Sequence, residues 1–178
     1  SRYTGYTRYG AQVSYGNLSG IGDELSLAGL TSFNGLNDYD IGYNLPVGRD
    51  GLRISLHQSR VVYTLGDIFA DMNANGQSNT TSAALNYPLV RSRAFNLNAS
   101  LGFDHKRLRD DIESADTFNP RTDNLWNVGI DGHFSDTWGG GGANRFSLSY
   151  VRGNLSLNDE TAAAIDDISA QTAGSFGK

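Results

Sequence analysis

One stretch of ten residues, from Phe95 to Asp104, constrains the fold of this chain more than any other. Its odd-numbered positions hold Phe, Leu, Ala, Leu and Phe, and its even-numbered positions hold Asn, Asn, Ser, Gly and Asp. Successive side chains of a β-strand point to opposite faces of the sheet. The stretch therefore predicts a strand with one apolar and one polar face, which is typical of an antiparallel sheet.

The same alternation recurs along the chain and is interrupted by Gly-rich and Asn-rich turns, with Asn75-Gly76 as a hairpin signal. No segment has the apolar spacing of a helix over more than two turns. We therefore predict an all-β antiparallel up-and-down meander of about eight strands. The expected strands are Tyr9–Leu18, Glu24–Phe33, Tyr39–Val47, Leu52–Leu65, Ala83–Leu89, Phe95–Asp104, Trp126–Phe134 and Arg145–Gly153.

Two polar segments are expected to connect or follow these strands. The segment His105–Asn124 is predicted to be the longest connection, and its acidic cluster (Asp110, Asp111, Glu113 and Asp116) is predicted to be a solvated loop. The segment Asn158–Gly177 is Ala-rich and polar, and we expect a loop or a short helix there.

Composition excludes several classes of protein. The chain contains no Cys, so it has neither a disulfide framework nor a thiolate metal site. Its net charge of -5 does not favour nucleic acid as a partner, because such partners require a basic surface. The 22 Gly, 9 Tyr and 8 Phe against only 3 Pro are typical of many strands and tight turns.

The apolar faces of the strands face either a protein core or lipid. Several of the predicted strands are nine or ten residues long, which is the length that crosses a bilayer at a tilt. Aromatic residues lie near the strand ends, as in the interfacial girdles of membrane barrels. A mean hydropathy of -0.40 does not contradict this, since alternation hides the apolar face of such strands. A soluble sandwich would tolerate the same pattern, so a soluble β-domain stays open as an alternative.

The membrane interpretation assigns each strand residue to one of two environments. The polar positions are predicted to line a lumen: Asp38, Asp40, Arg53, His57, Asn96, Asn98, Asp104, Asn127, Asp131 and His133. The apolar positions are predicted to face lipid: Tyr39, Ile41, Tyr43, Phe95, Leu97, Leu101, Phe103, Trp126, Val128, Ile130, Phe134, Phe146, Leu148 and Tyr150.

The order of four landmarks resembles the transporter component of two-partner secretion. This is the haemolysin and filamentous-haemagglutinin secretion/activation family of the Omp85 superfamily. The landmarks are Thr4-Gly5 followed by Gly20-Ile21-Gly22-Asp23-Glu24-Leu25, then Tyr43-Asn44-Leu45-Pro46-Val47-Gly48 with Gly51-Leu52, then Leu85-Asn86-Tyr87-Pro88-Leu89, and finally Gln171-Thr172-Ala173-Gly174-Ser175-Phe176-Gly177.

The resemblance implies that residues 1–178 form the first half of a sixteen-stranded outer-membrane β-barrel. Two periplasmic POTRA domains and the second barrel half, with its Val-Arg-Gly-Tyr loop, would lie outside this chain. It also implies a pore that translocates a large partner exoprotein across the bacterial outer membrane, with membrane lipid as the other partner. No enzyme activity, cofactor, nucleic acid or small-molecule substrate is expected.

The residues alone leave three other interpretations open. One is a small stand-alone eight-stranded barrel of structural or adhesive function, which would require its first and last strands to pair. The second is a soluble β-domain that binds protein or glycan. The third is an enzyme, although the chain has no G-x-S-x-G nucleophile motif. The three histidines (His57, His105 and His133) are predicted to be lone residues rather than metal ligands, and which turns face outward is undecided.

Overall fold

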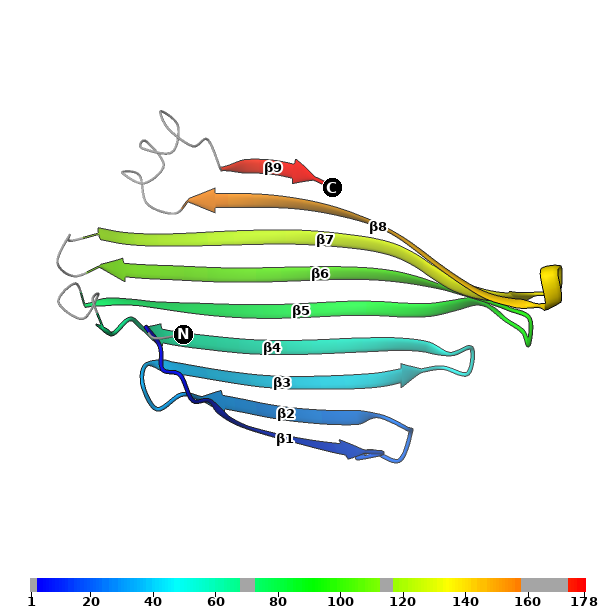
Figure 1. Ribbon diagram of the computed structural model, residues 1–178, viewed down its shortest axis with the longest axis horizontal. Helices are drawn as coiled ribbons and strands as arrows, with labels where there is room; N and C mark the ends of the chain where they lie inside the picture. Colours follow the sequence, from blue (N-terminus) through cyan, green and yellow to red (C-terminus); the bar gives the residue numbers. More distant parts are fainter. Residues whose placement is uncertain (1–2, 68–72, 113–116, 158–172) are drawn as a thin grey trace.

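The computed structural model describes residues 3–67, 73–112, 117–157 and 173–178, and these form one antiparallel sheet of nine strands. The strands pair strictly in sequence order, from β1 to β9. Figure 1 shows them stacked in that order, with β1 and β9 at the two edges of the sheet. The predicted all-β meander is therefore confirmed. The strands are β1 (Tyr9–Gly16), β2 (Glu24–Thr31), β3 (Leu36–Val47), β4 (Leu52–Thr64), β5 (Ala74–Arg91), β6 (Phe95–Ile112), β7 (Thr117–Asp136), β8 (Gly142–Leu157) and β9 (Gly174–Gly177).

The central strands are much longer than predicted. The opening stretch forms only the first part of β6, which continues to Ile112, and β7 begins at Thr117. The pairing of β6 with β7 runs without a break from Phe95 opposite Phe134 to Ile112 opposite Thr117. The predicted connection at His105–Asn124 is wrong, because backbone pairing continues where the apolar and polar alternation ends.

Two further local predictions are wrong, because strands occupy positions where turns or loops were expected. The dipeptide Asn75-Gly76 is not a turn; it lies in β5 opposite Thr64 and Tyr63 of β4. The tail contains a ninth strand of four residues, β9, which pairs with β8. Glu113 and Asp116 of the predicted acidic loop lie outside the described residues.

The sheet has almost no interior. Among the described residues, Ala74 is the one buried hydrophobic side chain, whereas Val13, Trp126 and Leu148 are 65%, 52% and 68% exposed. A soluble sandwich would pack this face against a second sheet, and the described residues contain a single sheet. The fold is therefore held by strand pairing and cross-strand contacts, and its apolar face requires an apolar surrounding. The described residues include no helix long and apolar enough to cross a membrane.

Both edges of the sheet are open. Within the described residues, β1 pairs with β2 alone, and β8 pairs with β7 and β9. Pairing of the first strand with the eighth, which a small closed barrel requires, is not present. The order of the strands is that of a segment of a larger barrel wall.

The two ends of the strands differ. At one end, on the right in Figure 1, β3–β4, β5–β6 and β7–β8 are joined by hairpins at residues 48–51, 92–94 and 137–141, the last containing a 3-10 turn, Trp138–Gly140. At the other end, on the left, β3 and β4 end nearly level with β5, β6 and β7, because Thr64 of β4 pairs with Asn75 of β5. The strands β5, β6 and β7 are 18, 18 and 20 residues long. The chain before β1 returns to this left end, where the Gly66 amide donates a hydrogen bond to the Tyr3 carbonyl.

Candidate functional site

The strand register decides which side chains share a face, because directly paired residues of neighbouring strands point the same way. One row across β3 to β8 consists entirely of apolar residues that pair in turn: Leu45, Ile54, Leu85, Leu101, Val128 and Tyr150. We call the face that carries this row the apolar face, and the opposite one the polar face.

The predicted site residues divide between the two faces without exception. The register places every residue predicted to face lipid on the apolar face, and every residue predicted to line a lumen on the polar face. What each face contacts stays a prediction, since the structure contains this chain alone.

Several predicted lumen residues are brought together as hydrogen-bonded pairs. The His57 imidazole and the Asp40 carboxylate are 2.7 Å apart, between Nε2 and Oδ2. The Asn98 amide donates to the Asp131 carboxylate at 3.0 Å. These pairs join neighbouring strands side chain to side chain across the polar face.

Two more contacts complete the pattern. The Asn96 amide lies 3.1 Å from His133 Nε2, on the same strand pair as Asn98 and Asp131. Arg53 Nε donates to the Asn44 side chain at 3.1 Å. Asp38, Asp104 and Asn127 lie on the same face. No group of three potential ligands for a metal ion occurs in the part of the chain that the structure describes.

A cluster that the sequence analysis missed lies on the polar face near the left end of the strands. The Tyr63 hydroxyl donates to Asp110 Oδ1 at 2.6 Å, and Arg121 forms an ion pair with the other oxygen of Asp110. Tyr63 belongs to β4 and Asp110 to β6, so the Tyr63 side chain reaches across β5 to Asp110. The cluster of Tyr63, Asp110 and Arg121 therefore ties β4, β6 and β7 together.

Gly76 makes this reach across β5 sterically feasible. It lies on β5 between the two partners, opposite Tyr63 and opposite Asp110. A Cβ atom at Gly76 would lie 2.5 Å from the Tyr63 ring and 2.7 Å from Asp110 Oδ1. A larger residue there would push the two groups apart, so the glycine of the apparent turn signal is a packing position.

A second missed residue is Asp23, in the turn between β1 and β2. Its side chain is 1% exposed in a sheet with almost no interior. The Tyr43 hydroxyl donates to Asp23 Oδ2 at 2.6 Å, and the Ser19 amide donates to Oδ1 at 3.0 Å. The hydrogen bond from the Tyr43 hydroxyl, more than that from the Ser19 amide, lowers the pKa of the Asp23 carboxyl.

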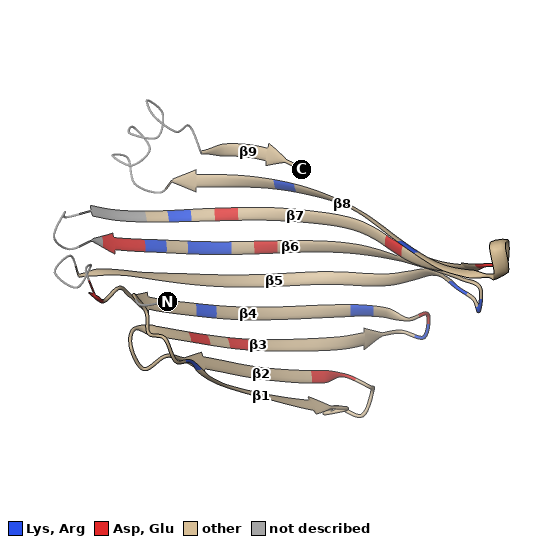
Figure 2. Cartoon of the chain, viewed as in Figure 1, with Lys and Arg blue, Asp and Glu red and all other residues tan. Residues whose placement is uncertain are grey.

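Charge divides the sheet along the strands as well as between its faces. In β6 every charged residue lies in the second half, from Asp104 to Asp111, and β5 has none before Arg91 (Figure 2). On the apolar face, the part of β6 without polar side chains runs from Phe95 to Phe103 and that of β7 from Trp126 to Phe134. We call this part of the apolar face the apolar band, and the ends of β4 to β7 beyond it the polar extension.

The aromatic residues of β6 and β7 on this face lie at the ends of the band. The rings of Phe103 and Trp126 contact each other at 4.7 Å between centroids, next to the polar extension. Phe95 and Phe134 pair at the other end. A band of nine strand residues between aromatic pairs matches the apolar belt and girdles of outer-membrane barrels.

Comparison with known proteins agrees with this arrangement. The profile of the haemolysin secretion/activation protein family ShlB/FhaC/HecB matches residues 1–175. The chain belongs to this family. Its members are outer-membrane transporters of Gram-negative bacteria, and the outer membrane is therefore the location of this chain.

Individual relatives cover nearly all of the chain. It is 31% identical over 175 residues to the heme/hemopexin transporter protein HuxB of Haemophilus influenzae strain 86-028NP, which is 97% of this chain and 31% of that protein. HuxB of a second strain, Rd, is 31% identical over 156 residues, or 87% of this chain and 27% of the relative. The chain thus spans about a third of the length of these relatives.

A solved structure has the same fold. CdiB from Acinetobacter baumannii superposes with a TM-score of 0.58 over 83% of this chain and 31% of that protein, at 19% sequence identity. The sheet described above is therefore a fold found in a solved protein of about three times the matched length.

Proposed function

We propose that this chain forms part of the wall of an outer-membrane pore through which a partner exoprotein is exported. The observation that carries the proposal is the separation of apolar and polar residues between the two faces of the sheet within the apolar band, from Phe95 to Phe103 in β6 and from Trp126 to Phe134 in β7. Together with family membership, it supports lipid on the apolar face and a watery passage on the polar face.

The polar face suits the passage of an unfolded chain. Its hydrogen-bonded pairs, such as Asn98 with Asp131 and Asp40 with His57, satisfy one another across neighbouring strands. They present hydrated groups without large apolar surfaces to which a passing segment would adhere. In this proposal the chain transports without catalysis, and its partners are membrane lipid and the exoprotein rather than a small molecule or nucleic acid.

We further propose that this segment is the first half of a larger barrel. The open edges at β1 and β9 support this arrangement over a closed eight-stranded barrel. Unpaired edges of this kind pair readily with other strands, and further strands of the full-length protein would cover them.

The structure also supports one orientation in the membrane. Outer-membrane barrels have short periplasmic turns and longer extracellular parts. Short hairpins at residues 48–51, 92–94 and 137–141 lie at the right end, whereas the left end carries the polar extension and one short turn, at residues 32–35. The right end is therefore periplasmic in our proposal and the left end extracellular, which places the start of β1 at the cell surface.

Cysteine cross-linking of the full-length protein during export tests this function. The chain has no Cys, and Asn127 and Val128 are neighbours in β7 that point to opposite faces. An exoprotein stalled in the pore and carrying a Cys should form a disulfide with Asn127→Cys. The matched Val128→Cys variant should instead react with a lipid-soluble maleimide.

Two outcomes would refute the proposed function. Equal cross-linking of the exoprotein to both variants would mean that the faces are not separated by the pore wall. Cross-linking at Val128→Cys alone would reverse the assignment. Export should be measured for both variants beforehand, so that only export-competent proteins are compared.

A further inference from the structure

Three arginines of β4 and β6 lie on the apolar face just beyond the apolar band, and a fourth on this face, Arg152 of β8, lies opposite Trp126. Arg60 of β4 pairs with Asn79 of β5, and Asn79 pairs with Arg107 of β6. Arg60 and Arg107 therefore lie in one row across the sheet, on either side of Asn79. Arg109 lies two residues further along β6, opposite Gln77. All three arginine side chains are exposed. We call Arg60, Arg107 and Arg109 the basic row.

Two of these three charges are not offset by a carboxylate. Arg109 forms an ion pair with Asp111 at 2.9 Å. Arg60 donates to the neutral Gln77 side chain at 3.5 Å, and Arg107 Nε donates to His105 Nε2 at 3.0 Å. Among the described residues, neither Arg60 nor Arg107 has an acidic partner.

Apart from Asp111, the acidic residues that lie near the basic row belong to the other face. Asp40, Asp104, Asp110 and Asp123 all point to the polar face. The sheet backbone therefore separates them from the basic row. A positive surface results on the side that our proposal assigns to the membrane.

His105 fixes the position of Arg107. Its Nδ1 lies 2.6 Å from Asn124 Oδ1 and its Nε2 accepts from Arg107. A neutral imidazole protonated at Nδ1 satisfies both contacts at once. The Arg107 guanidinium thus contacts His105 through its Nε atom, and the side chain is exposed.

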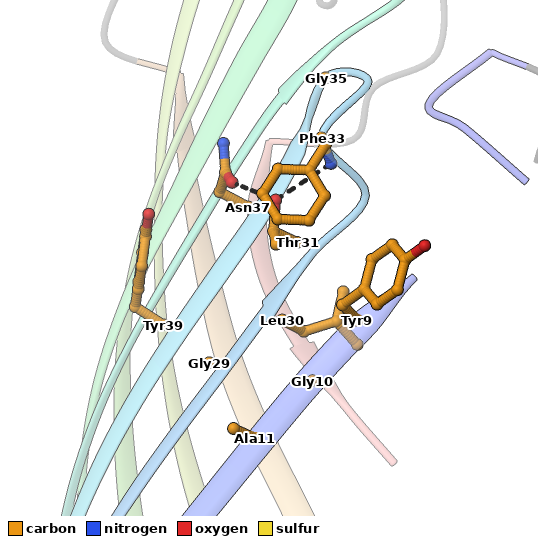
Figure 3. Close-up of a pocket in the computed structure, with 10 residues that line it drawn as sticks. All are labelled: Tyr9, Gly10, Ala11, Gly29, Leu30, Thr31, Phe33, Gly35, Asn37 and Tyr39. Carbon is orange, nitrogen blue, oxygen red and sulfur yellow. Dashed lines mark hydrogen bonds between the residues drawn. The ribbon is translucent and has the colours of Figure 1, made fainter. Parts of the chain in front are cut away.

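An apolar groove adjoins the same row. Tyr39 is the direct cross-strand partner of Arg60. It forms one side of a groove of about 660 Å³ whose other side includes Tyr9 and Phe33, with the rings of these two 5.5 Å apart. Figure 3 shows the small residues Gly29 and Ala11 among the residues that line this groove, together with Leu30 and Thr31.

We propose that the basic row and this groove together bind a phosphorylated glycolipid of the outer leaflet, with lipid A as its chemical class. Guanidinium groups bind phosphate through paired hydrogen bonds. Arg60 and Arg107 are two strands apart, which is about 10 Å. That separation suits two phosphates carried at opposite ends of a disaccharide, while an acyl chain occupies the groove beside Tyr39.

The height of the basic row in the membrane is consistent with a headgroup. Arg107 lies four residues beyond Phe103, which is about 13 Å along the strand. At the tilt of barrel strands this is about 10 Å along the membrane normal. A residue that far beyond the aromatic end of the apolar band lies in the headgroup layer rather than in the hydrocarbon core.

Native mass spectrometry of the full-length protein in detergent tests the proposal with purified lipid A as the probe. The double variant Arg60→Gln/Arg107→Gln should bind lipid A about thirtyfold more weakly than the unchanged protein. Each arginine near an anionic lipid surface strengthens binding by a factor of about five, and the variant removes two. The matched control removes two arginines from the polar face, Arg53→Gln/Arg145→Gln, and should bind lipid A unchanged.

A third variant tests the groove separately. Gly29 has an ordinary backbone conformation, and a Cβ atom there would approach no atom closer than 3.9 Å, so Gly29→Leu fills the groove without a backbone clash. It should weaken binding of lipid A but leave binding of its deacylated headgroup unchanged. Unchanged binding of lipid A by Gly29→Leu would remove the groove as an acyl site.

Other outcomes overturn the proposal directly. Equal binding of lipid A by the basic-row variant and the control would remove the basic row as a phosphate site. Equal binding of dephosphorylated lipid A would do the same, and displacement by millimolar inorganic phosphate would identify a site for free phosphate instead. The inference shares its assignment of faces with the proposed function. Exoprotein cross-linking is measured separately, so failure of lipid binding does not imply failure of export.

Discussion

The two halves of β6 differ in side chains but not in backbone structure. From Phe95 to Phe103 the strand alternates apolar and polar residues, whereas from Asp104 onward it is almost wholly polar on both faces. The pairing with β7 nevertheless runs through both halves without a register shift. In this protein, alternation therefore marks the part of a strand that has two different surroundings, and it does not mark the length of the strand.

The largest expected effect comes from placing a charge in the first half of β6. Leu101→Arg on the apolar band should destabilise the full-length protein in lipid vesicles by about 2–4 kcal/mol, because the charge would lie near the middle of the bilayer. The measurement is urea unfolding in vesicles. His105→Arg, on the same face but four residues further along β6, should cost less than about 1 kcal/mol. Equal losses would show that lipid surrounds both halves alike.

Gly76→Ala should have the next largest effect, and in the polar extension rather than in the apolar band. Its Cβ atom would lie within 2.5 Å of the Tyr63 ring, and forcing an extra carbon into a packed contact costs about 1–3 kcal/mol. Gly102→Ala is the control, because a Cβ there would meet nothing closer than 3.7 Å. Unfolding measurements that found the same cost for both substitutions would contradict the packing role of Gly76.

Tyr63→Phe tests the same cluster with a smaller change. It removes the hydroxyl that donates to Asp110 and keeps the ring over Gly76, so the expected loss is about 1–3 kcal/mol. Amide exchange should accelerate in the polar extension of β4 to β6 and stay unchanged at Leu101. Faster exchange throughout β6 would mean that the two halves unfold as one unit.

The smallest expected effect is a pH dependence at the opposite edge of the apolar band. The folded-state pKa of Asp23 is lowered, so its hydrogen bonds with Tyr43 and Ser19 stabilise the turn fully at neutral pH. This contribution is lost as the pH falls through the lowered folded pKa. Amide exchange in residues 17–23 should accelerate in acid, and Asp23→Asn should abolish this pH dependence. An unchanged acid response in that variant would assign it to another group.

The sequence was sufficient to predict whatever depends on the contrast between the two faces. Phe95 to Phe103 and Trp126 to Phe134 alternate, so their strands, their faces and the membrane interpretation all followed from residue order. The family resemblance rested on turn residues such as Gly22 and Asp23, and the family match confirms it. The buried role of Asp23 was missed, because a turn aspartate is usually solvated and its partner Tyr43 is distant in sequence.

The polar extension could not be predicted for a physical reason. When both faces of a strand carry polar residues, its sequence resembles that of a loop. Such a strand is stabilised by backbone pairing with the neighbouring strands. Asp110 and Asp111 were accordingly assigned to a loop, although they point to opposite faces of β6 and pair with Arg121 and Arg109. Asn75-Gly76 was misassigned as a turn, since the need for a glycine beneath Tyr63 appears only when the register is known.

The uninterrupted pairing of β5, β6 and β7 has a mechanical consequence for a pore. From Asp104 to Ile112 the strand continues for about 26 Å, or roughly 20 Å along the membrane normal at the usual tilt. In the orientation proposed above, the part of the wall beyond Arg107 stands above the headgroup layer as a rigid extension of the pore. A polypeptide released at its rim would begin to fold well clear of the lipid surface, where neighbouring headgroups cannot compete for its newly exposed apolar segments.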